Sequence, residues 1–239
     1  MTEIKTARPA SRAVATRTDG NKQATVFMAG NMQVKLTPQI VRDYLVAGDP
    51  KSVTFQELAM FINLCKFQGL NPWLREAYLI KYGTKPATLV TGKEAFMKRA
   101  ERHPQYDGFK AGIILVRNNE VIYTEGMFAL PDDEIVGGWA EVYRKDRSVP
   151  YRSEASISEY VGKKADGTIN GQWQSKPATM IRKVALVQAL REAFPEELGA
   201  MYIAEEQGQE PMQIPMEEVP EEVKNSSSEE VVDDSTAGA

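Results

Sequence analysis

The residues of this chain best suited to chemistry are cations interleaved with aromatic side chains, near residues 139–191. Between residues 144 and 191 there are ten Lys or Arg residues and four Asp or Glu residues. The aromatic residues of this region are Trp139, Tyr143, Tyr151, Tyr160 and Trp173. Cations bind phosphates and aromatic rings accept bases by stacking, so the pattern is typical of proteins that hold a single nucleic-acid strand without reading its sequence. A recognition helix for duplex DNA would need base-reading Asn or Gln residues at its exposed N-terminus, and we find no such set.

The element that must position these cations is a helix of about five turns, predicted over Gln172–Phe194. Pro177 is tolerated at the first helical position, Ser175 or Lys176 would be the cap, and Pro195 prevents continuation. The helix has no acidic residue before Glu192. One face is expected to be apolar, with Lys183 and Arg191 at its margins; its residues are Met180, Val184, Val187, Leu190 and Phe194. The alternative is an ordinary core helix whose cations extend to solvent.

The periodicity of the remaining chain predicts an α+β fold, with an antiparallel sheet (a hairpin plus a meander) and helices packed against it. The strands are expected at 77–82, 87–90, 109–116, 121–128 and 136–143. Further helices are expected near 37–48, 54–69, 91–104 and 153–161. The second of these helices has the clearest signal, because Thr54 and Glu57 form a capping box and Gly69 is a C-terminal stop.

Composition divides the chain into three regions. Residues 1–35 are predicted to be a flexible basic arm, 36–201 a folded core, and 202–239 a disordered acidic tail. The whole chain has a net charge of −4, but residues 205–239 contain eleven acidic residues and one Lys, a net of −10. Residues 1–204 therefore have 28 basic and 22 acidic residues, a net of +6. A basic body with an acidic tail is common in proteins that hold polyanions.

Cysteine, histidine and hydropathy exclude several classes of protein. The single Cys65 and the single His103 leave no disulfide framework and no Cys/His metal site. No apolar run reaches the length of a membrane span, and no apolar segment follows the N-terminus. We therefore expect a protein of the reducing cytoplasm without a membrane partner.

Two motifs resemble catalytic sites. Residues 89–94 resemble a strand–Gly–Lys–helix phosphate loop, but Ala87 stands where the first Gly is required and Glu94 where Ser or Thr would hold magnesium. Lys93 remains a position for a DNA phosphate.

Asp132, Asp133 and Glu134 would suit a metal-dependent nuclease only if carboxylates from other elements converged on the same ion, and a solvated turn is the simpler interpretation. No nucleophile–base pair is evident, so the sequence does not predict an enzyme.

Three blocks of residues, in the same order and with matching spacing, resemble the RecT/Bet family of phage single-strand annealing proteins, in particular its lambda Bet branch. They extend from about Thr54 to Met201, roughly three-fifths of the chain. The blocks are Gly69-Leu70-Asn71-Pro72-Trp73 with Glu76 and Tyr78; Val142-Tyr143-Arg144-Lys145-Asp146-Arg147; and Trp173-x-Ser175-x-Pro177-x-x-Met180-x-Arg182 with Arg191 and Phe194.

The resemblance implies a protein that coats single-stranded DNA and pairs it with a complementary strand. It implies a Rad52-like annealing core that binds single strands and nascent duplex and assembles into homo-oligomeric rings or helical filaments. No ATP or other cofactor is required, with magnesium as an aid to annealing. A phage exonuclease and the host single-strand binding protein are the implied partners, in the cytoplasm of a bacterial host that carries the phage or prophage. The family groove would use Arg75, Lys145 and Arg191 here.

Combining composition with resemblance, we predict a phosphate-binding groove that leaves the base edges open. Trp173 is either a stacking platform in that groove or an anchor in the core. A strand-coating protein without annealing activity and a metal-dependent nuclease are the alternatives. The predicted DNA-binding residues are Arg75, Lys93, Lys98, Arg144, Lys145, Arg147, Trp173, Lys176, Arg182, Lys183 and Arg191.

Overall fold

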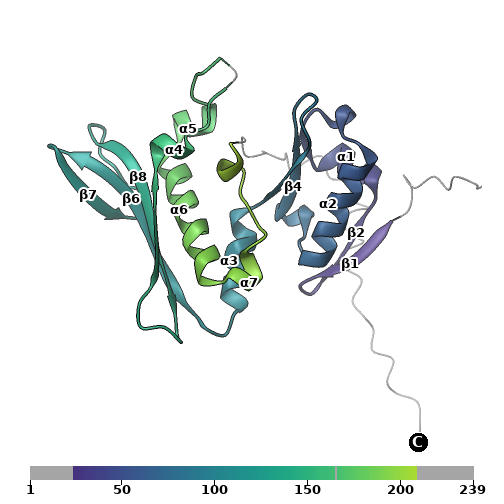
Figure 1. The fold of residues 1–239 in the computed structure, drawn as a ribbon, viewed down its shortest axis with the longest axis horizontal. Helices are drawn as coiled ribbons and strands as arrows, with labels where there is room; N and C mark the ends of the chain where they lie inside the picture. The colour runs from purple at the N-terminus through teal and green to yellow at the C-terminus, as the bar shows by residue number, and fades with distance from the viewer. Residues whose placement is uncertain (1–23, 165, 209–239) are drawn as a thin grey trace, which may run out of the picture.

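A computed structural model describes residues 24–164 and 166–208 (Figure 1). The described chain begins with a hairpin of β1 (Thr25–Ala29) and β2 (Met32–Leu36), which turns at Gly30 with a φ of +63°. The prediction of a flexible arm over residues 1–35 is therefore wrong from Thr25 onward, and residues 1–23 lie outside the described part. The physical reason is a period-two alternation that places the side chains of Phe27, Ala29 and Val34 in the core.

The N-terminal lobe is completed by two helices and a three-stranded sheet, ordered β3-β4-β5. Helix α1 (Pro38–Tyr44) leads into β3 (Val46–Gly48), which pairs in parallel with β4 (Ala77–Lys81), and β4 pairs antiparallel with β5 (Thr88–Thr91). The sequence predicts the antiparallel pair correctly but extends the first helix to Gly48, where the structure has β3. A three-residue strand is too short to show a period of its own.

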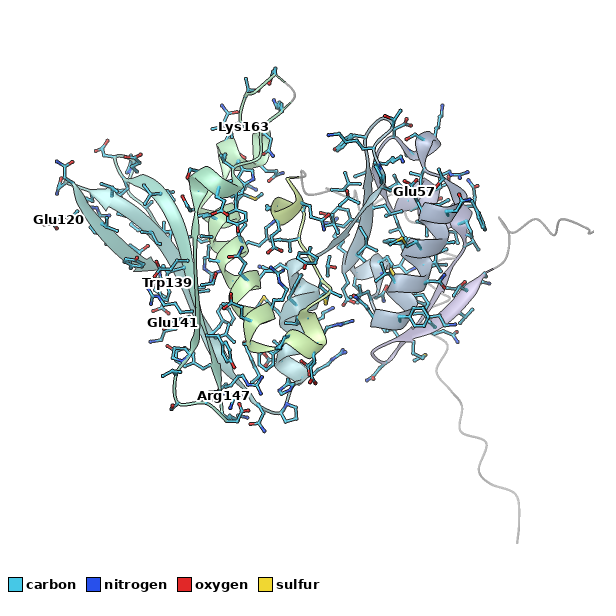
Figure 2. All side chains as sticks on the ribbon, in the orientation of Figure 1. Glu57, Glu120, Trp139, Glu141, Arg147 and Lys163 are labelled. Carbon is cyan, nitrogen blue, oxygen red and sulfur yellow. The ribbon has the colours of Figure 1, made fainter. Side chains whose placement is uncertain are left out.

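Helix α2 (Phe55–Gln68) has the predicted boundaries. The Thr54 amide donates to Glu57 Oε2 over 2.8 Å, the Glu57 amide donates to Thr54 Oγ1 over 3.3 Å, and Gly69 ends the helix with a φ of 55°. Glu57 also accepts from Lys81 Nζ at 2.8 Å and from the Ala87 amide at 2.7 Å (Figure 2). Glu57, the second residue of the α2 capping box, therefore also joins the helix to β4 and to the loop before β5.

The C-terminal lobe contains a four-stranded antiparallel sheet in the order β7-β6-β8-β9. Strands β6 (Tyr106–Arg117), β7 (Glu120–Glu125) and β8 (Glu134–Arg144) lie near the predicted positions. The prediction that they form a meander is wrong, because β8 pairs with β6 instead of β7 and β6 lies between them. The predicted helix over 153–161 is wrong for most of its length: β9 (Tyr151–Ser156) pairs with β8, and only the four-residue α4 (Ile157–Tyr160) is helical. In β9, exposed Arg152 and Glu154 alternate with buried Ser153 and Ala155, a period that small residues conceal.

Helix α6 (Pro177–Ala193) lies across one face of this sheet, preceded by the short α5 (Gly171–Ser175) and followed by α7 (Pro195–Leu198) (Figure 1). Pro177 is the first helical residue, as predicted, and Lys176 is the cap out of the two predicted candidates. The prediction of one helix from Gln172 is wrong, because residues 171–175 form the separate α5. The helix approaches β8 closely at Gly138, where a Cβ atom would lie 2.6 Å from the carbonyl oxygen of Ile181.

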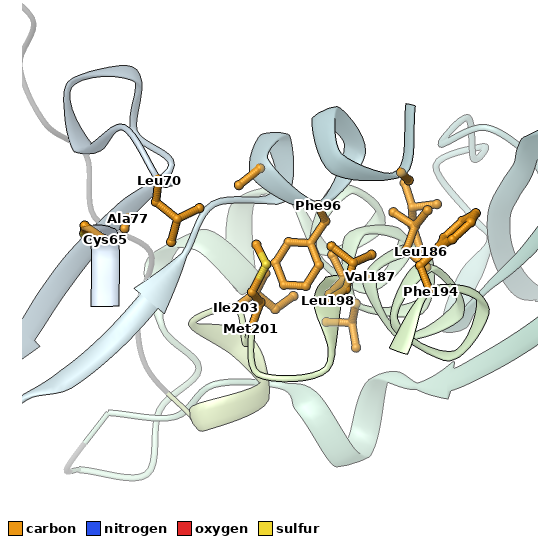
Figure 3. Packing of buried hydrophobic residues seen from close by; sticks show 14 of the residues in the cluster. Cys65, Leu70, Ala77, Phe96, Leu186, Val187, Phe194, Leu198, Met201 and Ile203 are labelled. Atoms are coloured by element: carbon orange, nitrogen blue, oxygen red, sulfur yellow. The ribbon is translucent and has the colours of Figure 1, made fainter. Parts of the chain in front are cut away.

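The helix predicted over 91–104 is α3 (Lys93–Arg102), which has Gly92 as its N-cap and connects the two lobes. Its Phe96 side chain is fully buried and lies close to Val187 of α6 and to Leu198 and Met201 (Figure 3). One hydrophobic cluster extends from Phe27 in β1 to Ile203, so both lobes share a core.

The chain after α7 remains ordered in a segment that we call the strap (residues 201–208). Met201, Ile203 and Ala204 are buried, and the three-residue turn η3 (Glu205–Gln207) follows. The prediction of a disordered tail from residue 202 is therefore wrong as far as residue 208, because apolar residues fix the strap in the core; residues 209–239 lie outside the described part. The predicted α+β fold is confirmed. None of the described helices combines the length and apolar character that a membrane crossing requires.

Candidate nucleic-acid interface

Two predicted DNA-binding residues, Lys183 and Arg191, point from α6 to the strap. The Lys183 ammonium forms an ion pair with the Glu205 carboxylate. Arg191 forms a two-point ion pair with Glu206, with N–O distances of 2.5 and 2.9 Å. Arg191 Nη1 also donates to the Met201 carbonyl over 3.1 Å, and its guanidinium lies 4.7 Å from the centre of the Tyr202 ring.

These ion pairs are largely removed from water. The Glu205 side chain is 1% exposed and that of Glu206 is 7% exposed, while Lys183 and Arg191 retain about a fifth of their exposure. The hydrogen bonds that Arg191 donates to the Glu206 carboxylate raise the pKa of Arg191 above its ordinary value. Carboxylates of the same chain thus occupy the positions at which Lys183 and Arg191 would hold phosphates.

The strap also touches the start of α3, where three more predicted cations lie. The Thr91 amide donates to the Tyr202 carbonyl over 2.9 Å, and the Gly92 amide donates to the Glu76 carbonyl over 3.0 Å. A Cβ atom on Gly92 would lie 2.3 Å from the Arg75 carbonyl oxygen, so this glycine permits the close approach of the two backbones.

This contact places Arg75, Lys93 and Lys98 around one helix start. Arg75 has a left-handed backbone conformation at the end of η2 (Pro72–Leu74). Lys98 pairs with Glu76 at 2.7 Å, and Lys93 lies 3.8 Å from Glu94. The strap therefore joins the cations of α6 to those near the start of α3.

The other predicted cations of the C-terminal lobe do not join this group. Arg182 donates to the Ala111 carbonyl of β6 over 3.2 Å, and burial lowers its pKa although Glu125 opposes the change. Lys176 is exposed at the N-terminal end of α6. The cations of α6 thus leave the helix in different directions.

Arg144 at the end of β8 has a structural role. It donates to the Ala193 carbonyl over 2.5 Å, pairs with Asp146 at 2.8 Å and lies 5.1 Å from the centre of the Phe194 ring. It therefore joins β8 to the C-terminal end of α6. Lys145 and Arg147 lie beyond it in the exposed β8–β9 turn.

The predicted row of cations from residue 144 to 191 is not continuous on the described surface. Arg147 and Lys163 lie at opposite ends of the C-terminal lobe, with α6 between them (Figure 2). Lys183 and Arg191, the last two members of the predicted row, are paired with the strap. The expectation of an open furrow along these residues is therefore wrong for this conformation of the chain.

Trp173 is buried in the core and only 2% exposed. This contradicts its assignment as a DNA-contacting residue and agrees with the alternative, an anchor at the entry to α6. The local reason is the cap of α5, in which Asn170 Oδ1 accepts from the Trp173 amide over 3.0 Å.

Two aromatic residues of the sheet, Tyr123 and Trp139, contact a cation of the same chain. On the sheet face opposite α6, Arg152 lies 5.4 Å from the ring centres of both Tyr123 and Trp139 (Figure 2 labels Trp139). Arg152 is itself paired with Glu141 and Glu154. These aromatic rings already stack against a guanidinium group of the same chain.

The carboxylates considered for a nuclease form a turn. Asp133 binds the Arg117 guanidinium through two contacts of 2.7 Å and accepts from the Leu130 amide, and the ion pair lowers the pKa of Asp133. Across residues 24–164 and 166–208, no group of three or more His, Cys, Asp or Glu side chains could hold a metal ion.

Glu205 and Glu206 are not among the predicted site residues, because the acidic composition of residues 202–239 predicts a disordered tail. A signal was present: Met201, Tyr202 and Ile203 continue an apolar pattern directly before the two acids. Apolar residues such as Met and Ile are most often buried, and the burial of Met201 and Ile203 fixes the acids that follow them against the core.

Comparison with known proteins agrees with this architecture. The model of the RecT family matches residues 31–221. The chain is 26% identical over 162 residues to recombination protein bet of Escherichia phage lambda, which covers 64% of this chain and 52% of that protein. It is 28% identical over 144 residues to an uncharacterized protein of Ureaplasma parvum serovar 3, which covers 60% and 56%, respectively.

The chain spans about half the length of these curated relatives. The family match, by contrast, includes both lobes, α6 and the strap. The predicted resemblance is confirmed, and this chain belongs to the RecT family.

Proposed function

We propose that this chain is an ATP-independent single-strand annealing protein that acts in phage-type homologous recombination. The observation that carries the proposal is membership of the RecT family across both lobes, together with the similarity to a recombination protein of phage lambda. The chain would bind single-stranded DNA and pair it with a complementary strand.

The charge of the described core supports this function. The charged residues of helix α6 before Glu192 are all cations. Lys145, Arg147 and Lys163 lie in the loops near its two ends. Such side chains hold a strand by its phosphates, and that contact carries no sequence information. The bases stay open to a second strand, and Watson–Crick pairing supplies the specificity.

The proposal includes assembly and partners. The chain would form a homo-oligomeric ring or helical filament on a Rad52-like core, in the cytoplasm of a bacterial host. It would use no cofactor, with magnesium as an aid to annealing. A phage exonuclease and the host single-strand binding protein are the proposed partners. Electron micrographs with and without single-stranded DNA test the assembly, and uniform single particles under both conditions would contradict it.

The activity is tested by mixing two complementary labelled oligonucleotides with the chain, without ATP and with magnesium. We expect duplex to form faster than in a mixture without protein. Strands that are bound but not paired would indicate a coating protein, and shortened strands would indicate a nuclease. Either result would overturn the proposal. A non-complementary pair is the control, because a protein that only aggregates DNA would treat both pairs alike.

A further inference from the structure

The strap presents successive anions to the cations of α6, as a nucleic-acid backbone does with its phosphates. Glu205 and Glu206 are consecutive, and each places its carboxylate on a different cation of α6, with Lys183 and Arg191 eight residues apart. The two-point geometry between Arg191 and Glu206 is the geometry that guanidinium also adopts with phosphate. The Tyr202 ring covers Arg191 from the same segment. One short stretch of chain thus supplies two anions and an aromatic ring to the basic surface.

The closed strap carries an energetic cost. Glu205 Oε2 is buried without a hydrogen-bond partner among the described residues, and so is the hydroxyl of Thr91, whose amide holds the strap. A buried charge that lacks part of its hydrogen bonding offsets much of the attraction in its ion pair. A partner that satisfies the cations while returning Glu205 to water would therefore compete well with the strap.

The acidic end of the strap is also attached differently from its beginning. Met201 and Ile203 are buried side chains of the shared core. Beyond Ala204, the η3 turn is held by its ion pairs and by few other contacts, such as the 3.3 Å hydrogen bond from Gln207 Nε2 to the Leu89 carbonyl. The turn ends at Gly208 in a left-handed conformation. Met201 and Ile203 thus anchor the strap to the core. The η3 turn can separate from α6 while these two residues stay buried.

We propose that residues 205–208 form an autoinhibitory latch, in which Glu205 and Glu206 hold Lys183 and Arg191 until the phosphates of a single DNA strand displace them. This inference rests on the proposed function, because it takes single-stranded DNA as the competing polyanion. Opening of the latch frees two cations beside the Tyr202 ring, which is already 45% exposed, and cations beside an aromatic ring are the combination that holds a single strand.

The first test compares two double variants that change the net charge equally. The first double variant, Glu205→Gln with Glu206→Gln, removes the charges of the latch. The second, Glu196→Gln with Glu197→Gln, removes the charges of a nearby acidic pair on α7. We expect the first variant to bind oligo-dT about tenfold more tightly than the unmodified chain, the ratio for a latch that is open roughly a tenth of the time. The α7 variant reports the effect of net charge alone and should change affinity much less. Equal gains in the two variants would overturn the inference.

The second test uses the unmodified chain, so it holds even if a variant fails to fold. Hydrogen exchange followed by mass spectrometry reports on the amides of Thr91, Ile203 and Gly208, which the closed strap protects. We expect oligo-dT to speed exchange in the peptide that contains residues 203–208, while peptides of α6 exchange no faster. Unchanged or slower exchange in the strap, at saturating DNA, would overturn the latch.

The two proposals fail in different ways. A chain that binds no single-stranded DNA at low salt contradicts the proposed function itself. A chain that binds and anneals DNA while the strap stays protected, with no gain from Glu205→Gln and Glu206→Gln, contradicts only the latch.

Discussion

Glu205 and Lys183 show how one residue pair can serve both stability and binding. The carboxylate is buried and has Lys183 as its cation partner, while one of its oxygens accepts no hydrogen bond among the described residues. Removal of the cation leaves a charge in a poorly solvated site, which costs more than the intact pair contributes.

We therefore predict that Lys183→Ala lowers the free energy of unfolding by about 1 kcal/mol, because a tenfold preference for the closed latch is worth about 1.4 kcal/mol and Glu205 returns to water once the latch opens. The combined change Lys183→Met with Glu205→Leu should recover most of this loss. Urea denaturation followed by circular dichroism measures both. Lys176→Ala removes an exposed cation from the start of the same helix and should stay near the unmodified value. A loss in the combined variant as large as in Lys183→Ala would contradict this explanation.

At the scale of elements, α2 depends on one carboxylate that also binds the neighbouring sheet. Burial by itself would raise the pKa of Glu57, but hydrogen bonds from Lys81 and from the amides of Thr54 and Ala87 lower it from 4.5 to about 2. The charged form is therefore favoured in the folded state, and its contribution to stability is present above pH 4.5 and lost as the pH falls from 4.5 to 2.

We predict that Glu57→Gln destabilises the chain at pH 7 by about 2 kcal/mol, through loss of the capping box and of charge-assisted hydrogen bonds. The difference between the two proteins should shrink through the same acidic window, because the unmodified Glu57 becomes protonated there. Thermal unfolding from pH 7 to pH 3 measures it. A difference that stays constant with pH would show that the Glu57 charge contributes nothing.

The contact between α6 and the four-stranded sheet depends on a missing side chain. A Cβ atom at Gly138 would lie 2.6 Å from the Ile181 carbonyl oxygen and 3.0 Å from the Arg182 amide. Gly138→Ala should push α6 away from β8 and cost about 2 kcal/mol of stability, typical of overpacking. Gly171→Ala is the matched control, because nothing lies within 4 Å of its added Cβ. Equal melting temperatures for both variants would contradict the close approach.

At the scale of the whole molecule, charge is distributed unevenly along the chain. Residues 1–204 have a net charge of +6 and residues 205–239 a net of −10. If four cations contact phosphates, the logarithm of affinity for single-stranded DNA should fall against the logarithm of salt concentration with a slope of about −3. Lys183→Ala with Arg191→Ala should reduce this slope by about 1.4 and weaken binding to all sequences alike.

Titrations of labelled oligo-dT and of a mixed-sequence strand at several salt concentrations measure these slopes. Lys51→Ala with Lys85→Ala, which removes two exposed cations of the N-terminal lobe, is the control. A slope near zero, or a loss confined to one sequence, would contradict contact through phosphates.

Local patterns of the sequence were sufficient for most elements. The α2 capping box, the Pro177 start of α6 and the approximate positions of β6, β7 and β8 were predicted because their determinants lie within a few residues of one another. The meander was not, because the pairing of β6 with β8 joins residues that are distant in the sequence. Strands β3 and β9 escaped prediction because one is three residues long and the other alternates with small side chains, so that only pairing with β4 and β8 defines them.

The sequence by itself determined the α+β class, the basic body and the family to which the chain belongs. Only the tertiary structure decided which cations are accessible. Trp173 is buried, and Arg144 and Arg182 donate to backbone carbonyl groups. Lys183 and Arg191 form ion pairs with Glu205 and Glu206 of the strap. Helical periodicity predicts that a cation lies at the margin of a helix face, but it does not predict which residue that cation pairs with. Here the partners come from the strap, which packs back against α6. That return depends on burial of Met201 and Ile203 in a core built from both lobes, and no local pattern contains it.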